Sequence, residues 1–316
     1  MRSNFLRISR DDLPRVIQFY KDGDTALIEM NKTCTTGNMQ ENNSAFEAWA
    51  LFLKSEGYNE IILSDNDTGE AKKSNTARLH YNRFLYRIMR FQEAFDWFTT
   101  SPELGKKVDT FRREVIMRDD LCVGAHTSRS TSDSTDLEAK VERILIRDAK
   151  RSFTNELLHV NVDRYFNQLP ISLFSDNDAT DKTKILPSDG SKVDLWGLEG
   201  SIINIVELKV DTNSDLGVIS QLFFYACFLQ EMYCQRHLER KDPPNLQKRK
   251  WIENRTERGY YKLRDANIEL VKAHFLLEQK HRYFDIAFNE LQKGNFDGVQ
   301  FKYATYPFSK MPEVQI

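Results

Sequence analysis

Three charged residues in one short segment have the types and the spacing to bind a metal ion. Asp194 precedes a Gly200-Ser201 pair, and Glu207 and Lys209 follow it. If Gly200 and Ser201 form a two-residue turn, Asp194 faces Glu207 across an antiparallel hairpin, with Cβ atoms roughly 5 Å apart. Two carboxylates this close repel each other unless a proton or a cation lies between them. The segment therefore predicts a site for a hard divalent ion such as Mg²⁺.

The run from Ile202 to Val210 is typical of a strand that is buried on both faces. Its two charged residues, Glu207 and Lys209, are costly in such a place unless they are paired or used. Side chains two apart on a strand share a face, so Lys209 is expected beside both carboxylates. A metal ion there could polarise a phosphate, and Lys209 could orient or help to deprotonate a water molecule. The alternative is a buried ion pair with a structural role.

Asp194, twelve intervening residues and then Glu207-Leu208-Lys209 on an apolar strand resemble the signature of the PD-(D/E)xK nuclease superfamily. Val193 stands where the signature has proline. The resemblance covers about residues 136 to 306 and implies a restriction-endonuclease-like mixed sheet with an α-β-β-β-α-β core. It also implies that Asp194, Glu207 and the backbone carbonyl of Leu208 bind Mg²⁺, for which Mn²⁺ can substitute.

Two further site residues follow only from this resemblance. A helix after the E-x-K strand often carries a glutamine near its start in the family, and Gln221 fits that place. The helix before the first strand often supplies another acidic ligand, for which Glu156 fits best and Glu142 is the second choice. Each has an ordinary alternative, since Gln221 could bond at a helix start and Glu156 could be an exposed helix residue.

The elements that position these residues follow an α/β pattern. A polar stretch from Thr127 to Thr135 separates an N-terminal unit, residues 1–130, from a C-terminal unit, residues 131–316. Alternating strands and helices in the second unit indicate an α/β sheet. The expected strands are Val193–Trp196, Ile202–Val210, Val271–Leu277 and Val299–Tyr306. Thr135 followed by Glu138 is a capping-box pattern, which is expected to open a helical stretch that continues, with a break, through Asn155 to Leu169. The other expected helices are Val218–Tyr233 and Arg282–Lys293.

The N-terminal unit is predicted to be mainly helical and to serve in docking or dimerisation. Ala45–Lys54 and Ala77–Phe98 have helical apolar spacing, and Glu60–Leu63 could be a short strand. The longer helix contributes a predicted core of Phe84, Ile88, Phe91, Phe95 and Phe98.

Basic residues on the same helix are the first candidates for contacts with nucleic acid. Arg83, Arg87 and Arg90 form a stripe that could hold phosphates or be an ordinary solvated face. Lys248 and Arg249, in a Lys/Arg-rich insertion, are further candidates. Because 45 Lys and Arg balance 47 Asp and Glu, any such contact must come from a local patch.

Several classes of protein are disfavoured. The four cysteines lack C-x-x-C spacing, which favours reduced thiols in a cytoplasmic protein. The sequence contains no run of 18 apolar residues, so a membrane span is not expected. The sequence contains no GxxxxGK[ST], GxGxxG or GxSxG motif of ATPases, dehydrogenases or α/β-hydrolases.

We therefore expect a Mg²⁺-dependent endonuclease that hydrolyses phosphodiester bonds of nucleic acid. DNA is the expected substrate because the resembled superfamily mostly cuts DNA, and restriction or anti-phage defence is the expected setting. The alternatives are a repair or recombination nuclease, a non-cleaving nucleic-acid-binding module on the same fold, and a structural protein of a mobile element. Cutting both strands of a duplex would favour a symmetric homodimer.

Overall fold

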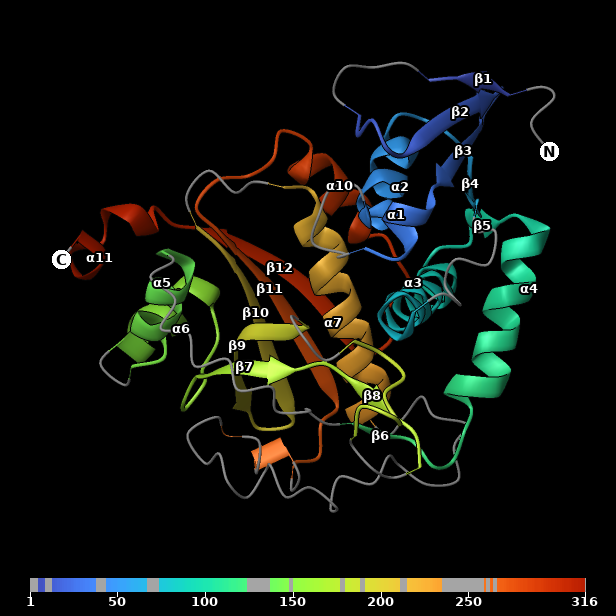
Figure 1. Cartoon of the computed structure of the whole chain (residues 1–316). Helices are drawn as coiled ribbons and strands as arrows, with labels where there is room; N and C mark the ends of the chain where they lie inside the picture. The colour runs from blue at the N-terminus through green and yellow to red at the C-terminus, as the bar shows by residue number, and fades with distance from the viewer. Residues whose placement is uncertain are drawn as a thin grey trace. The chain divides into compact units, whose positions relative to one another are not determined.

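The structure is a computed structural model that places the chain in two compact units, which are described separately (Figure 1). The boundary expected between residues 130 and 131 lies outside the described residues, and two later segments belong with the N-terminal unit. The first unit comprises Met1–Arg118, Asp215–Gln221 and His281–Phe296, and the second comprises Asp119–Ser214, Leu222–Lys280 and Asp297–Ile316. The described residues are 5–8, 13–37, 44–66, 74–123, 137–147, 150–176, 180–187, 191–210, 215–234, 259, 262–263 and 266–315.

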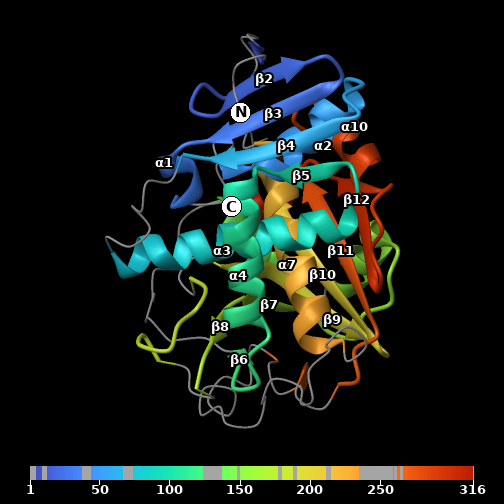
Figure 2. The same cartoon turned by 90° about the vertical axis from the view of Figure 1, so that its right-hand side faces the viewer.

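The first unit is built on a mixed five-stranded sheet in the order β1-β2-β3-β4-β5, of which Figure 2 labels β2 to β5. Strands β1, β2 and β3 pair antiparallel, whereas β3, β4 and β5 are parallel. The strands are β1 (Leu6–Arg7), β2 (Gln18–Asp22), β3 (Thr25–Met30), β4 (Glu60–Asp65) and β5 (Phe98–Thr100). The helices are α1 (Lys32–Thr35), α2 (Phe46–Ser55), α3 (Asn75–Ala94), α4 (Pro102–Phe111), the π-helix η3 (Arg112–Ile116) and α10 (Phe284–Leu291). The prediction of a mainly helical N-terminal unit is therefore wrong.

The structure of the first unit departs from the predicted one at the β2–β3 hairpin and at β5, which were not predicted. Gly23 adopts a φ of +54° between β2 and β3, a left-handed conformation that glycine reaches at little steric cost, so a hairpin forms there. The predicted second helix ends at Ala94, and Phe98 begins β5. The predicted core is confirmed, because Phe84, Phe95 and the other three residues of that set are at most 2% exposed.

The second unit contains a mixed five-stranded sheet in the order β12-β11-β10-β9-β7 (Figure 1). Strands β7, β9 and β10 pair antiparallel, whereas β10, β11 and β12 are parallel. The strands are β7 (Phe166–Pro170), β9 (Lys192–Glu199), β10 (Ile202–Lys209), β11 (Leu270–Leu277) and β12 (Val299–Thr305). A separate pair consists of β6 (Cys122–Val123) and β8 (Leu173–Phe174).

One predicted helix of this unit is wrong in its second half. Helix α6 (Arg151–Leu158) stops where Asn155–Leu169 was expected to continue. His159 has a left-handed φ of 53°, and the Asn155 side chain bonds both the N–H and the carbonyl of Val162. These contacts turn the chain away from the helix and lead it into β7.

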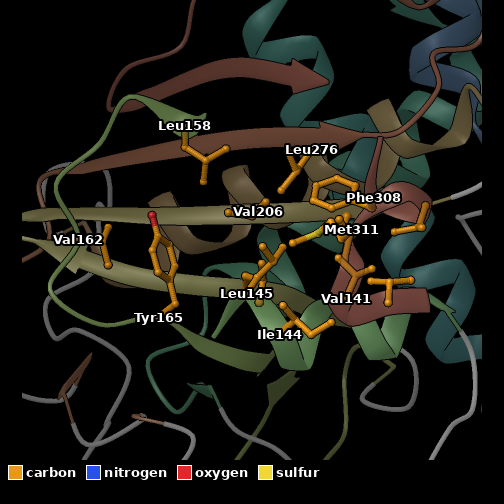
Figure 3. Packing of buried hydrophobic residues seen from close by; sticks show 14 residues of the cluster. Val141, Ile144, Leu145, Leu158, Val162, Tyr165, Val206, Leu276, Phe308 and Met311 are labelled. Carbon is orange, nitrogen blue, oxygen red and sulfur yellow. The ribbon is translucent and has the colours of Figure 1, made fainter. Parts of the chain in front are cut away.

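Helices cover both faces of the second sheet. Alternate residues of a strand point to opposite faces. Val206 and Leu208 of β10 therefore pack in one cluster with α5 (Leu137–Leu145) and α6 (Figure 3). On the other face, Phe223 of α7 (Gly217–Tyr233) stacks on Phe301 at 6.5 Å between ring centroids. The chain ends with the 3₁₀ helix η6 (Phe308–Lys310) and α11 (Pro312–Gln315). No helix in the described part of the chain has the length and apolar character needed to cross a membrane.

Candidate metal centre

The β9–β10 hairpin has the register that the sequence predicts. Ile202 pairs with Glu199 and Val206 pairs with Leu195, as a two-residue turn at Gly200-Ser201 requires. The ladder ends there, at the start of the candidate site.

Asp194 closes this end of the hairpin with its side chain. Its Oδ2 accepts a hydrogen bond from the backbone N–H of Leu208 at 2.8 Å. The carboxylate thus takes the place of a backbone partner, which fixes it beside Glu207 on the neighbouring strand.

Glu207 is a buried carboxylate whose two oxygen atoms differ. The side chain is fully buried; Oε1 accepts a hydrogen bond from Lys209 Nζ at 2.8 Å, and Oε2 is buried without a hydrogen-bond partner among the described residues. Burial, together with the charge of Asp194, raises the pKa of Glu207 well above its ordinary value. Burial also raises the pKa of Asp194 to about 6, although Lys209 and the Leu208 N–H act in the opposite direction. Two poorly hydrated carboxylates cannot both ionise cheaply, so the pair favours a shared proton or a cation.

Lys209 brings a positive charge to the pair. Nζ donates to Glu207 Oε1 and, at 3.0 Å, to the carbonyl of Leu208. A third acceptor, Glu138 Oε1 of α5, lies at 3.4 Å. Burial lowers the pKa of Lys209, but the carboxylates of Glu207 and Asp194 outweigh it, so the pKa is raised. Lys209 is therefore an ammonium group at neutral pH, suited to orienting a water molecule and offsetting phosphate charge rather than to accepting a proton.

Helix α5 adds two carboxylates on one side. Glu138 and Glu142 are four residues apart, so they lie one above the other on the helix surface. Glu142 Oε1 accepts from Asn167 Nδ2 at 2.7 Å and Oε2 accepts from Gln168 Nε2 at 2.9 Å. The charge of Glu142 contributes to raising the pKa of Asp194, so α5 lies close enough to influence the site.

The structure thus separates the acidic candidates. Glu142, the second choice, is buried near Asp194, whereas Glu156 is exposed on α6. Glu138 was not predicted from the sequence as a site residue. Its position four residues before Glu142, on the same face of a helix, could have indicated it.

The donor atoms fit a hard cation. Asp194, Glu207 and the Leu208 carbonyl offer oxygen atoms, and the unsatisfied Oε2 of Glu207 is the kind of buried atom that a cation, or a proton shared between the two carboxyl groups, would satisfy. Mg²⁺ is usually held by one or two carboxylates and keeps several water molecules. Within the described ranges, no group of three or more His, Cys, Asp or Glu side chains is arranged to hold a metal ion. An ion here would rely on two carboxylates, one carbonyl and water.

Gln221 is not brought together with these residues inside one unit. It is 1% exposed on α7, in the segment that belongs to the first unit, whereas Asp194, Glu207 and Lys209 belong to the second.

The predicted arginine stripe is not a solvated surface. Arg87, 2% exposed, donates to both carboxylate oxygens of Glu47, and the Nε–Oε1 distance is 2.7 Å. Arg83, 3% exposed, donates to the carbonyl of Gly37 at 3.3 Å. The expectation of an exposed stripe is therefore wrong for these two, which are buried and bonded to other segments of the first unit. Arg90 is partly exposed and pairs with a glutamate on its own helix. Lys248 and Arg249 lie outside the described residues.

Comparisons of the chain with family models, with curated proteins and with solved structures found no match.

Proposed function

We propose that this chain is a metal-dependent nuclease of the PD-(D/E)xK type, with Asp194, Glu207 and Lys209 at its catalytic centre. The observation that carries the proposal is the convergence of two carboxylates and one ammonium group at the end of a buried hairpin. A second support is the chain order α6, β7, β9, β10, α7, β11, which is the α-β-β-β-α-β order that the resemblance implies once the two-residue β8, paired with β6 outside this sheet, is left out. In the sheet, β7, β9, β10 and β11 are neighbours in that sequence.

Charge at the site explains why such an enzyme would need a metal. The carboxylates of Asp194, Glu207, Glu138 and Glu142 lie in one region, together with the ammonium group of Lys209. A phosphodiester is itself an anion, so it would be repelled by ionised carboxylates without a compensating cation.

The residues divide the chemistry between them. A bound Mg²⁺ would supply positive charge against the phosphate oxygens and would lower the pKa of a water molecule. Asp194, Glu207 and the Leu208 carbonyl would hold the ion. Lys209 would orient the attacking water and offset the charge that develops on the phosphate. DNA as substrate, and restriction or anti-phage defence as setting, follow from the resemblance and belong to the same proposal.

A non-cleaving binding module on the same fold is the second candidate. It is favoured by one observation: Lys209 has acceptors in Glu207, Leu208 and Glu138, as a structural ion cluster would.

Cleavage assays on the full chain test the proposal. Supercoiled plasmid, linear duplex, single-stranded DNA and RNA are incubated with Mg²⁺, Mn²⁺ or EDTA. Metal-dependent cutting is expected, and Glu207→Ala and Lys209→Met should each reduce it by about 100-fold or more. Glu199→Gln is the matched control, because Glu199 pairs with Lys272 on the same sheet.

Calorimetric titration with Mn²⁺ separates the two candidates. Cutting together with Mn²⁺ binding that Glu207→Ala loses supports the nuclease. Mn²⁺ binding without cutting of any substrate favours the binding module. If the protein neither binds Mn²⁺ nor cuts any substrate, the proposed metal centre is refuted.

A further inference from the structure

The acceptors of Lys209 come from two different elements. Glu207 Oε1 at 2.8 Å and the Leu208 carbonyl at 3.0 Å belong to β10, and the proposed function assigns that carbonyl and the other oxygen of Glu207, Oε2, to the metal ion. Glu138 Oε1, at 3.4 Å, belongs to α5 and is not among those ligands. Glu138 is therefore the acceptor of Lys209 that lies on a different element from the ion's proposed ligands on β10.

A divalent ion and Lys209 would share the Leu208 carbonyl and would sit on the two oxygen atoms of one carboxylate, the ion at Glu207 Oε2 and Lys209 at Oε1. Both are cations, so they would repel each other in this poorly hydrated site. Binding of the ion would therefore push Lys209 away from the Leu208 carbonyl and weaken its bond to Glu207 Oε1. Lys209 would then depend more on Glu138, its acceptor on α5.

Glu138 is well placed to hold Lys209 because its helix is fixed on the sheet. Ile144 and Leu145 of α5 are buried in the same cluster as Leu208. One turn after Glu138, the carboxylate of Glu142 is bonded by two side chains of β7. Glu138 itself is 27% exposed and Lys209 is 12% exposed, so the pair lies at the margin of the core rather than deep within it.

We propose that Glu138 is a positioning residue of this centre. Its carboxylate retains the ammonium group of Lys209 when a divalent ion takes the oxygen atoms of Glu207 and Leu208, and it thereby keeps Lys209 directed at a bound phosphodiester. This inference rests on the proposed nuclease function and concerns the same site.

The chain offers a closely matched control pair. Lys272 Nζ lies 3.4 Å from Glu199 Oε2, the same distance as between Lys209 and Glu138. The exposed fractions also match: 16% and 28% for Lys272 and Glu199, against 12% and 27% for Lys209 and Glu138. Glu199→Gln therefore reports what losing a similar ion pair does to this sheet.

The kinetic test compares Glu138→Gln, Glu138→Asp and Glu199→Gln at saturating Mn²⁺. Loss of the positioning charge in Glu138→Gln should lower kcat by about 10-fold or more, as for partners that orient a catalytic group. KM for DNA and the Mn²⁺ concentration for half-maximal rate should stay within about 2-fold of the wild-type values. Glu138→Asp should recover part of kcat, and Glu199→Gln should cut like the wild type. An unchanged kcat in Glu138→Gln would overturn the proposal. So would a change confined to the Mn²⁺ dependence, which would make Glu138 a metal ligand.

A labelling test does not depend on cleavage. The rate at which an amine-acylating reagent modifies Lys209 is followed by mass spectrometry, with Lys140 and Lys272 as internal references. In Glu138→Gln, Mn²⁺ should accelerate labelling of Lys209 several-fold relative to the wild type, because Glu138 then no longer helps to retain the ammonium group that the ion pushes away. Equal acceleration in both proteins would refute the role of Glu138. Calorimetry on the same samples keeps the two hypotheses apart, since absence of Mn²⁺ binding would refute the metal centre itself.

Discussion

Replacing Asp194 by asparagine is expected to stabilise the second unit at neutral pH and to abolish metal binding there. Burial raises the pKa of Asp194 from 3.8 to about 6. Asparagine has nearly the same shape, and its side-chain carbonyl can still accept the hydrogen bond from the Leu208 N–H. It cannot ionise, so the substitution removes the buried charge and keeps the hydrogen bond.

The sign and the size follow from the raised pKa. The folded protein holds the proton of Asp194 more tightly than the unfolded chain, so this carboxyl costs no stability below its unfolded pKa of 3.8. Stability is lost as the pH rises from there towards about 6, and it stays lost at higher pH. A shift of about two units corresponds to about 3 kcal/mol. Asp194→Asn should therefore gain almost nothing at about pH 4 and as much as about 3 kcal/mol above about pH 7.

Urea unfolding between about pH 4 and 8 in EDTA measures this difference. Pulsed hydrogen exchange on peptides from β9 and β10 assigns the transition to the second unit. Asp163→Asn, at an exposed position of the same unit, is the control and should follow the wild type. Mg²⁺ should raise the stability of the wild type by mass action and leave Asp194→Asn unchanged. A gain of equal size at both ends of the pH range would refute the reasoning, because it could not come from a titrating carboxyl.

Two further predictions concern packing. Glu47→Ala should destabilise the first unit by about 3–5 kcal/mol, because it leaves the buried Arg87 without its charge partner, and urea unfolding at neutral pH measures the loss. A loss below about 1 kcal/mol would show that Arg87 finds another partner or water. Gly197→Ala should cost the second unit about 1–3 kcal/mol. The added Cβ would lie 2.3 Å from Val162 Cγ1, and a midpoint equal to that of the wild type would mean that the segment around Val162 yields freely.

The sequence by itself determined the hairpin and the three residues at its end. A two-residue turn fixes which residues of β9 and β10 pair, and the alternation of a strand then fixes the face of each side chain. Both rules are local, so Asp194, Glu207 and Lys209 could be brought together without knowledge of the rest of the fold. The long apolar periodicity of α3 and the strand character of β11 and β12 were equally local signals.

The tertiary structure decided what the local pattern could not. Glu142 and Glu156 both lie on helices before β7, and only the packing of α5 on β10 brings Glu142 and Glu138 towards the site. The burial of Arg87 likewise depends on Glu47, which is 40 residues away in the chain. The N-terminal sheet pairs β3, β4 and β5 in parallel across intervening helices, and such non-local pairing leaves little trace in any single segment. Each of these outcomes was set by which elements pack together, whereas the hairpin carries its own register.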